Sequence, residues 1–317
     1  MIWSIILFIL GFFILVKGSD VLIDGSRSIA KRLHISNWVI GITVIGIGTS
    51  IPEFSITLFS ALQGKADIGL GAIIGSNTFN ILMILGLVAL IYPISAKKRW
   101  VSWDLTVNVL AIFSAAVIAV FPVIGGGFFE ITRGEGLLFL LLFIIWIFRE
   151  ALRNGTDRDT DEEEPNLKIF SLHLSFIMIL GGLAGVIFGG EWVVNGAKTI
   201  AFWLGASEAT VGLTIVAIGT SLPELAVSLR AAYRRNFGIS LGNIVGSNIF
   251  DFWGILGIAG TFTAIKIPRE LLLDFGVTFV SAIILMTMML TGVRYVLQRW
   301  QGAVMISAYI FYLIFLV

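Results

Sequence analysis

The chain has 317 residues, of which 57% are hydrophobic and 13% are charged, and its formal net charge is +1. This composition, with a mean hydropathy of +0.99, lies outside the range of soluble globular domains and provides no basic surface for nucleic acid. The sequence contains no cysteine, which excludes disulfides, thiolate metal sites and cysteine nucleophiles. Apolar runs of about 20 residues recur along the chain and indicate a polytopic helical membrane protein.

Ten hydrophobic segments are predicted to cross the membrane as helices. They cover residues 2–24, 38–62, 67–91, 102–124, 135–152, 170–194, 208–231, 239–263, 271–293 and 300–316. The first segment lacks the basic start and the small-residue cleavage site of a signal peptide, so we interpret it as a membrane helix. The predicted fold class is therefore all-α, with ten transmembrane helices.

One strongly polar interval interrupts this pattern. Residues 149–168 include the run Asp157-Arg-Asp-Thr-Asp-Glu-Glu-Glu-Pro165, which is typical of a solvated linker. We expect the linker to comprise residues 153–168. It divides the chain into two halves, 1–152 and 169–317, with five segments each.

The two halves repeat one another. Residues 41–86 contain Gly48-Thr-Ser-Ile-Pro-Glu53 and Gly75-Ser-Asn-Thr-Phe-Asn80, and residues 212–257 contain Gly219-Thr-Ser-Leu-Pro-Glu224 and Gly246-Ser-Asn-Ile-Phe-Asp251. The motif positions recur at a constant offset of 171 residues. Because each half has an odd number of segments, the second half should enter the membrane in the opposite orientation. Inverted repeats of this kind are typical of secondary transporters.

Lysine and arginine residues predict the orientation. With the N-terminus outside, fifteen of the 21 basic residues fall in cytoplasmic connections and five in external ones, while Lys17 lies within the first segment. The positive-inside rule then places both termini outside the cell and the acidic linker in the cytoplasm.

The repeated motifs place oxygen-bearing side chains inside apolar segments. In each copy a threonine, a serine and a glutamate at positions i, i+1 and i+4 share one face of a helix. Each glutamate follows a proline, which removes a helical N–H and releases carbonyls near residues 46–48 and 217–219. Hydroxyl, amide, carboxylate and carbonyl oxygens suit hard cations. Two ionised glutamates inside a membrane favour a divalent cation, which several sodium ions could replace.

Other features favour structural interpretations. Asp20 and Glu191 lie near the ends of segments one and six, where structural or interfacial roles are expected. His34 and His173 lie outside the motifs, which argues against an intramembrane hydrolase. The repeat itself argues against a cation channel, which would use rings of like residues.

The doubled motif resembles the two α-repeats of sodium/calcium exchangers, and the chain is similar to prokaryotic members of that family along nearly its whole length. The resemblance implies that segments one and six slide across the other eight. It also implies a cluster of four cation sites built from the motif positions. Glu53 and Glu224 would be the central carboxylates, and Asn80 and Asp251 would complete the middle of the cluster. The calcium and flanking sodium positions would be lined by Thr49, Thr220 and the carbonyls of Gly46 and Ala217. The sodium sites would receive hydroxyl oxygens from Ser50, Ser221, Ser76 and Ser247.

We therefore expect a secondary active antiporter that exchanges Na⁺ for Ca²⁺ by alternating access and extrudes Ca²⁺ electrogenically. Alternatives are a H⁺/Ca²⁺ antiporter or a K⁺-dependent Na⁺/Ca²⁺ exchanger using the same carboxylates. The expected location is the cell membrane. The expected partners are the transported ions and the lipid bilayer, with no cofactor, nucleic acid or protein partner.

Overall fold

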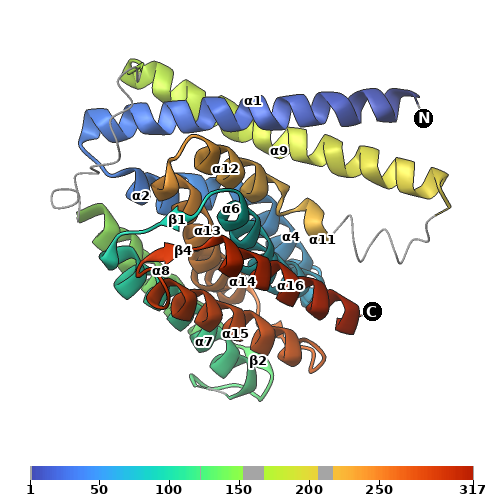
Figure 1. The fold of residues 1–317 in the computed structure, drawn as a ribbon. Coiled ribbons are helices and arrows are strands. Elements are labelled where there is room, and N and C mark those ends of the chain that lie inside the picture. Colours follow the sequence, from blue (N-terminus) through green and yellow to red (C-terminus); the bar gives the residue numbers. More distant parts are fainter. Residues whose placement is uncertain (1, 122, 153–167, 206–216, 317) are drawn as a thin grey trace. The chain divides into compact units, whose positions relative to one another are not determined.

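The computed structural model of the protein describes residues 2–121, 123–152, 168–205 and 217–316. The chain is helical almost throughout (Figure 1) and forms two compact units. Unit 1 comprises Met1–Thr49 and Arg153–Asn243, and unit 2 comprises Ser50–Leu152 and Ile244–Val317. Each unit thus takes residues from both halves of the sequence. All of the expected linker except Lys168, and residues 212–216 of the second motif, lie outside the described residues.

Unit 1 contains two long helices and several short ones, where η denotes a π-helix. They are α1 (Ile2–Leu33), α2 (Asn37–Ile40), η1 (Gly41–Ile45), α3 (Gly46–Thr49), α9 (Leu172–Trp203), α11 (Ala217–Gly219), α12 (Leu222–Tyr233) and the first part of α13 (Phe237–Ile249). α9 begins where the side chain of Ser171 accepts a hydrogen bond from Leu174 N. α1 ends with Lys31 and Arg32 in its last turn, where cations stabilise the helix dipole.

The helices α1 and α9 pack antiparallel through glycines spaced seven residues apart. Gly11, Gly18 and Gly25 of α1 correspond to Gly182, Gly189 and Gly196 of α9 at the offset of 171. A Cβ atom at Gly18 would lie 2.8 Å from Val186 N, and one at Gly182 would lie 2.6 Å from Leu22 N. The two backbones therefore approach as closely as small residues allow in membrane helix pairs.

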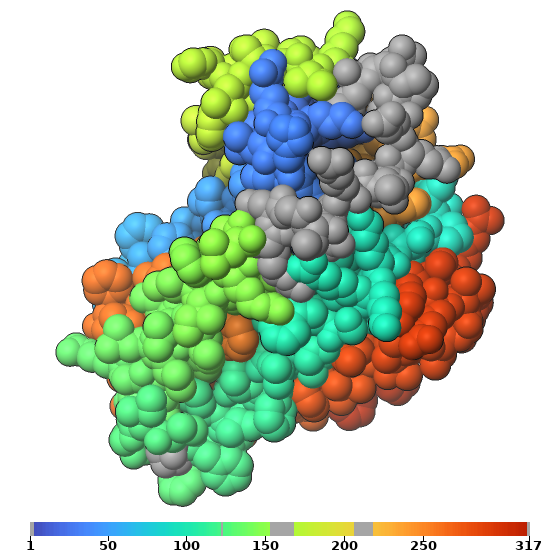
Figure 2. Space-filling view, turned by 90° about the vertical axis from the view of Figure 1, so that its left-hand side faces the viewer, coloured from blue at the N-terminus to red at the C-terminus, as the bar shows by residue number. Residues whose placement is uncertain are grey.

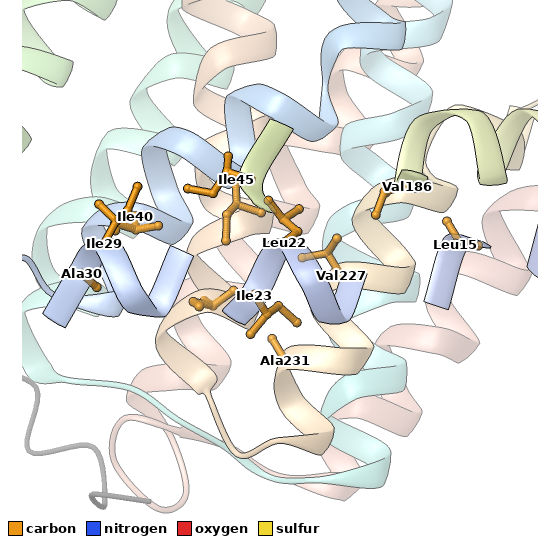
Figure 3. Packing of buried hydrophobic residues seen from close by; sticks show 12 residues of the cluster. Leu15, Leu22, Ile23, Ile29, Ala30, Ile40, Ile45, Val186, Val227 and Ala231 are labelled. Atoms are coloured by element: carbon orange, nitrogen blue, oxygen red, sulfur yellow. The ribbon is translucent and has the colours of Figure 1, made fainter. Parts of the chain in front are cut away.

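An apolar cluster and an ion-pair cluster attach α12 to this helix pair. Leu22 and Ile23 of α1 pack with Val227 and Ala231 of α12 (Figure 3).

The ion pairs involve the end of α12. Arg230 Nη2 donates to Asp20 Oδ2 at 3.0 Å, Arg234 Nη2 lies 2.8 Å from Asp20 Oδ1, and Arg234 also pairs with Asp24. Asp20 thus has the structural role expected for it. The first hydrophobic segment was predicted to end at residue 24, whereas α1 continues to Leu33 as a helix that includes charged residues.

Unit 2 contains the remaining elements. They are α4 (Ile51–Leu62), α5 (Ala66–Thr78), η2 (Phe79–Ile84), α6 (Leu85–Ile91), β1 (Ile94–Ser95), η3 (Trp100–Asp104), α7 (Leu105–Val120), β2 (Glu130–Ile131), α8 (Arg133–Leu152), the rest of α13, η5 (Phe250–Ile255), α14 (Leu256–Phe262), β3 (Ile265–Lys266), α15 (Leu271–Leu290), β4 (Val296–Leu297) and α16 (Arg299–Leu316).

Elements from the two halves of the chain pair crosswise within unit 2. β1 pairs antiparallel with β4, and β2 pairs antiparallel with β3; these short strands were not predicted. α6 packs on α16 and α14 packs on α8. The glycines Gly86 and Gly257, which are related by the 171-residue offset, occupy the two helix contacts, against Gly302 and Leu140 respectively.

The secondary structure repeats with the sequence. α4, α5, η2, α6 and β1 recur as α12, α13, η5, α14 and β3, with both ends of every element displaced by 171 residues. The repeat seen in the motifs therefore extends to the helix breaks and the π-helical turns. π-Helical turns of this kind are frequent at functional sites.

Several helices suit a membrane by length and composition. Within the described residues, the helices long and apolar enough to cross a membrane are six: Trp3–Leu33, Ala66–Ile91, Trp100–Val120, Leu172–Trp203, Phe237–Phe262 and Leu271–Leu290. The broken pair Asn37–Thr49 and Ile51–Leu62 adds a seventh candidate. The ten-helix count stays a prediction, although α8 and α16 cover the expected segments 135–152 and 300–316.

The outer face of unit 2 is apolar where it would meet lipid. Leu137, Leu141, Ile144 and Phe148 form one stripe along α8, and each is more than half exposed. Figure 2 looks onto the green surface of α8. Apolar side chains exposed at helical spacing are unfavourable in water and suit a hydrocarbon surrounding.

Candidate ion-binding site

The Ser-x-Pro-Glu sequence of each motif lies at the start of a helix. Ser50 and Ser221 are the N-cap residues of α4 and α12, with φ/ψ of −82°/11° and −88°/5°. The proline follows within the first two helical positions, where its missing N–H costs nothing. The local loss of helical hydrogen bonding predicted at each proline is thus a complete helix break. The predicted single helix face for threonine, serine and glutamate is wrong, because a new helix begins between the serine and the proline in both motifs.

This geometry places each glutamate in the first turn of a helix. Glu53 lies in the first turn of α4 and Glu224 in the first turn of α12. The positive end of the helix dipole stabilises a carboxylate there. Both side chains are only 1% exposed, so each carboxylate is withdrawn from bulk water.

The other predicted ligands are also withdrawn from solvent. Thr220 is half-buried, and the side chain of Ala217 lies outside the described residues. The remaining predicted site residues are buried: Gly46, Thr49, Ser50, Glu53, Ser76, Asn80, Ser221, Glu224, Ser247 and Asp251.

In unit 1, Thr49 belongs to a hydrogen-bond network that includes an unpredicted residue. Thr49 Oγ1 donates to Asn243 Oδ1 at 3.0 Å. Asn243 Nδ2 donates to Ser228 Oγ at 3.0 Å and to the Glu224 carbonyl at 3.3 Å. Asn243 thus joins the first motif's Thr49 to the helix that carries Glu224.

In unit 2, Asp251 lies beside the Gly-Ser-Asn turn of α5. Asn77 Nδ2 donates to Asp251 Oδ2 at 2.7 Å, and Ser76 Oγ lies 3.4 Å from the same oxygen. Asn80 Nδ2 donates to Asn248 Oδ1 at 3.3 Å. The structure therefore brings together Ser76 and Asp251, two of the predicted ligands in this unit.

Three buried oxygens of the two repeated motifs have no hydrogen-bond partner within the described part of the chain. They are Asn77 Oδ1 and Asn80 Oδ1 of the first motif and Ser221 Oγ of the second. A buried acceptor without a donor is costly in an apolar interior. A cation ligated by these oxygens would remove that cost, and amide and hydroxyl oxygens are ligands that hard cations accept.

Asn77, Asn243 and Asn248 were not among the predicted site residues. Asn77 and Asn248 stand in the repeated Gly-Ser-Asn motif, so their recurrence was a visible signal. Asn243 gave no such signal, because the equivalent residue of the first half is Ala72.

These features define a class of protein. Apolar helices of spanning length, helix breaks with buried carboxylates, and buried oxygens without donors are typical of membrane proteins that move cations.

Comparison with known proteins identifies the family. The sequence profile of the family described as "Sodium/calcium exchanger protein" matches residues 3–150 and 174–317. The chain therefore belongs to the sodium/calcium exchanger family, whose members are cation/calcium antiporters and not enzymes. This confirms the resemblance found in the doubled motif.

Individual relatives cover the whole length. An uncharacterized membrane protein of Methanocaldococcus jannaschii is 38% identical over 96% of this chain and 94% of its own length. The sodium/calcium exchanger MaX1 of Methanosarcina acetivorans is 30% identical over 99% of this chain and 98% of its own. A solved structure of the sodium-calcium exchanger NCX_Mj, soaked with zero Na⁺ and Ca²⁺, matches with a TM-score of 0.83 and 35% identity, covering 100% of this chain and 99% of that one.

Proposed function

We propose that this protein is a secondary active antiporter that exchanges Na⁺ for Ca²⁺ across the membrane by alternating access. The observation that carries the proposal is the pair of buried glutamates, Glu53 and Glu224, in equivalent first turns of interrupted helices. Two carboxylates match the charge of one divalent cation. Monovalent cations can replace it in the same oxygen ligands, which is the basis of exchange. The names of MaX1 and NCX_Mj agree with this substrate pair.

The remaining ligands supply neutral oxygens. In this proposal the carbonyls of Gly46 and Ala217 and the hydroxyls of the two threonines serve the Ca²⁺ and flanking Na⁺ positions, and the serines serve the Na⁺ positions. Asn80 and Asp251 complete the middle of the cluster. Support comes from the donor-less oxygens of Asn80 and Ser221 and from the burial of the predicted set. The neutral ligands are Gly46, Ala217, Thr49, Thr220, Ser50, Ser221, Ser76, Ser247 and Asn80.

The proposed architecture is ten spans in two inverted repeats, residues 1–152 and 169–317, joined by a cytoplasmic linker at 153–168. The displacement of five successive elements by 171 residues supports the repeat. The distribution of lysine and arginine supports both termini outside the cell. In inverted repeats of this kind, equivalent movements of the two repeats can open the ion site to either side of the membrane.

Net charge movement depends on how many Na⁺ ions replace one Ca²⁺, since two Na⁺ would balance Glu53 and Glu224 just as one Ca²⁺ does. In this proposal Asp251 is neutral and a third Na⁺ moves as well, so that each cycle carries one net positive charge. An inward Na⁺ gradient would then drive Ca²⁺ out of the cell with the help of the membrane potential. We therefore propose electrogenic Ca²⁺ extrusion.

Reconstituted liposomes test this function. Vesicles containing the purified full chain are loaded with Na⁺ or choline and diluted into radioactive Ca²⁺, with and without K⁺ on both sides of the membrane. The proposal expects uptake only with internal Na⁺, unchanged by a proton ionophore at zero voltage and altered by an imposed voltage. Uptake driven by a pH gradient without Na⁺ would assign proton coupling instead, and a requirement for K⁺ alongside Na⁺ would assign the K⁺-dependent alternative.

A further inference from the structure

We propose that Asn243 is a positioning residue that directs the hydroxyl proton of Thr49 away from the bound cation. The inference rests on the proposed function, in which Thr49 and the Gly46 carbonyl contribute oxygens to a cation site. Asn243 is 0% exposed and lies in unit 1 together with Thr49. Nothing in the repeated motifs marks it, since Ala72 stands at the equivalent place.

The hydrogen-bond network fixes the orientation of every polar group in it. Ser228 Oγ donates to the Ser240 carbonyl at 3.1 Å, and a carbonyl can only accept. Ser228 Oγ must therefore accept its other hydrogen bond, at 3.0 Å, from Asn243 Nδ2. The same Nδ2 faces the Glu224 carbonyl, which again can only accept. These two contacts leave Asn243 Oδ1 directed at Thr49.

The direction of the Thr49 proton follows from that orientation. An amide oxygen carries no hydrogen, so in the 3.0 Å contact Thr49 Oγ1 is the donor. A hydroxyl that points its proton at Asn243 points its lone pairs in other directions, and a cation ligand binds through lone pairs. The second acceptor near Thr49 Oγ1 is the Gly46 carbonyl at 3.4 Å, a longer contact.

Removing the amide would redirect the proton toward a predicted ligand. Without Asn243 Oδ1, the Thr49 hydroxyl would donate to the Gly46 carbonyl, so that two oxygens proposed for the site would bind each other. Both would then be less available to a cation. Asn243 therefore sets the cation affinity of this part of the site without touching the ion.

The first half of the chain contains the equivalent of the Ser228–Ser240 hydrogen bond but has no amide at the position equivalent to Asn243. Thr57 Oγ1 donates to the Gly69 carbonyl at 3.2 Å, which repeats the Ser228–Ser240 contact at the offset of 171. The methyl group of Ala72 can neither accept nor donate. The proton-directing amide thus belongs to one repeat, and the two equivalent threonines are not equivalent as ligands.

A double-mutant cycle in the full-length protein tests the proposal. The variants are Thr49→Val, Asn243→Ala and both together, since valine keeps the shape of threonine and alanine occupies position 72 in the repeat. The first readout is the apparent affinity for Ca²⁺ in Na⁺-loaded liposomes. The second is the rise in thermal unfolding midpoint with added Na⁺ or Ca²⁺ in detergent, which measures binding without transport.

We expect Asn243→Ala to weaken apparent cation affinity by about tenfold, the scale of one hydrogen bond that serves a charged group. In the Thr49→Val background the same change should have no further effect, because the hydroxyl that it acts through is gone. Ser228→Ala, which removes one of the two contacts that orient the amide, should weaken affinity by about two- to threefold, again only when Thr49 is present.

Additive effects of Thr49→Val and Asn243→Ala would overturn the proposal, because they would show that Asn243 acts on the fold alone. If Asn243→Ala does not fold, the same comparison is made with Ser228→Ala in the wild type and in the Thr49→Val variant. Absence of Na⁺-driven Ca²⁺ uptake by the wild type, with cation binding and the Thr49 dependence retained, would overturn the proposed function and leave the role of Asn243 supported.

Discussion

Gly181 and Gly182 are neighbours in α9, yet the same substitution to alanine is expected to change stability in opposite directions. A Cβ atom at Gly182 would lie 2.6 Å from Leu22 N and 2.7 Å from Leu22 Cα, both backbone atoms of α1. A Cβ atom at Gly181 would meet no atom within 4 Å. The two alanine variants therefore add the same methyl group, in one case against α1 and in the other where no atom lies within 4 Å.

The size of the effect follows from the distances. Ordinary van der Waals contact begins at 3.4 Å, so α1 would have to withdraw by about 0.8 Å at Leu22. No side-chain rotation relieves an overlap with backbone. Overpacking of this kind costs about 1–3 kcal/mol or more, against a gain of about 1 kcal/mol from the helix propensity of alanine. Gly182→Ala should therefore destabilise by up to about 2 kcal/mol, and Gly181→Ala should stabilise by up to about 1 kcal/mol.

The assay is thermal inactivation of the purified full chain in one detergent, followed as the fraction that remains monodisperse after heating. Ion concentrations are held equal for all variants, since bound ions shift the midpoint. Gly182→Ala should unfold several degrees below the wild type, and Gly181→Ala at or above it. Equal midpoints for the two variants would refute the close packing of α1 on α9.

Three further outcomes are expected from the same preparations. Glu53→Gln and Glu224→Gln should abolish Ca²⁺ exchange in liposomes while the protein still elutes as a folded species, because a neutral amide cannot balance a divalent cation; retained flux would remove that residue from the site. Asp20→Asn should lower stability by about 1–3 kcal/mol, between the values for exposed and buried pairs, because both guanidiniums that it binds are partly exposed; an unchanged midpoint would argue against the ion-pair cluster. Ser76→Ala and Ser247→Ala should weaken the Na⁺ dependence of uptake more than the Ca²⁺ affinity, and equal losses of both would contradict their proposed role.

The sequence predicted the parts of this molecule that repeat. The doubled Thr-Ser-x-Pro-Glu motif indicated a local distortion at each proline, because proline removes a helical N–H. The complete break with serine as the helix N-cap was not predicted, although serine and proline both favour a helix start. The motif also indicated the buried glutamates, whose charge within an apolar run requires a function or a counter-ion. These features depend on local chemistry, which is readable without knowledge of tertiary contacts.

Features that depend on partners distant in the sequence were not predictable in the same way. The ion pairs of α1 join Asp20 and Asp24 to Arg230 and Arg234, which are 210 residues away in the sequence. The four two-residue strands also pair with segments more than 100 residues away. Hydropathy marks where a helix can cross a membrane, but it does not reveal where a helix continues beyond its apolar residues or which distant residues pair with it.

Asn243 was missed for a different reason. The predicted site residues stand at positions that recur, whereas Asn243 is an exception to the repeat, with Ala72 as its equivalent. Its hydrogen bonds to Thr49 and to the Glu224 carbonyl became visible only in the structure. A repeat reveals shared scaffold, whereas differences between its copies reveal where the two halves perform different tasks.

The two copies share a backbone and differ in polar chemistry. From α4 to β1 and from α12 to β3 the helix bounds and the π-helical turn agree residue for residue at the offset of 171, but Asp251 stands opposite Asn80, and Asn243 opposite Ala72. Equal backbones give an antiporter equivalent motions toward the two sides of the membrane. Unequal ligands let neighbouring positions prefer cations of different charge, because a carboxylate, an amide and a proton-directed hydroxyl differ in how strongly they attract a divalent ion. The proposed exchange of Na⁺ for Ca²⁺ would need both properties, and the proposed inverted repeat with these substitutions would provide them.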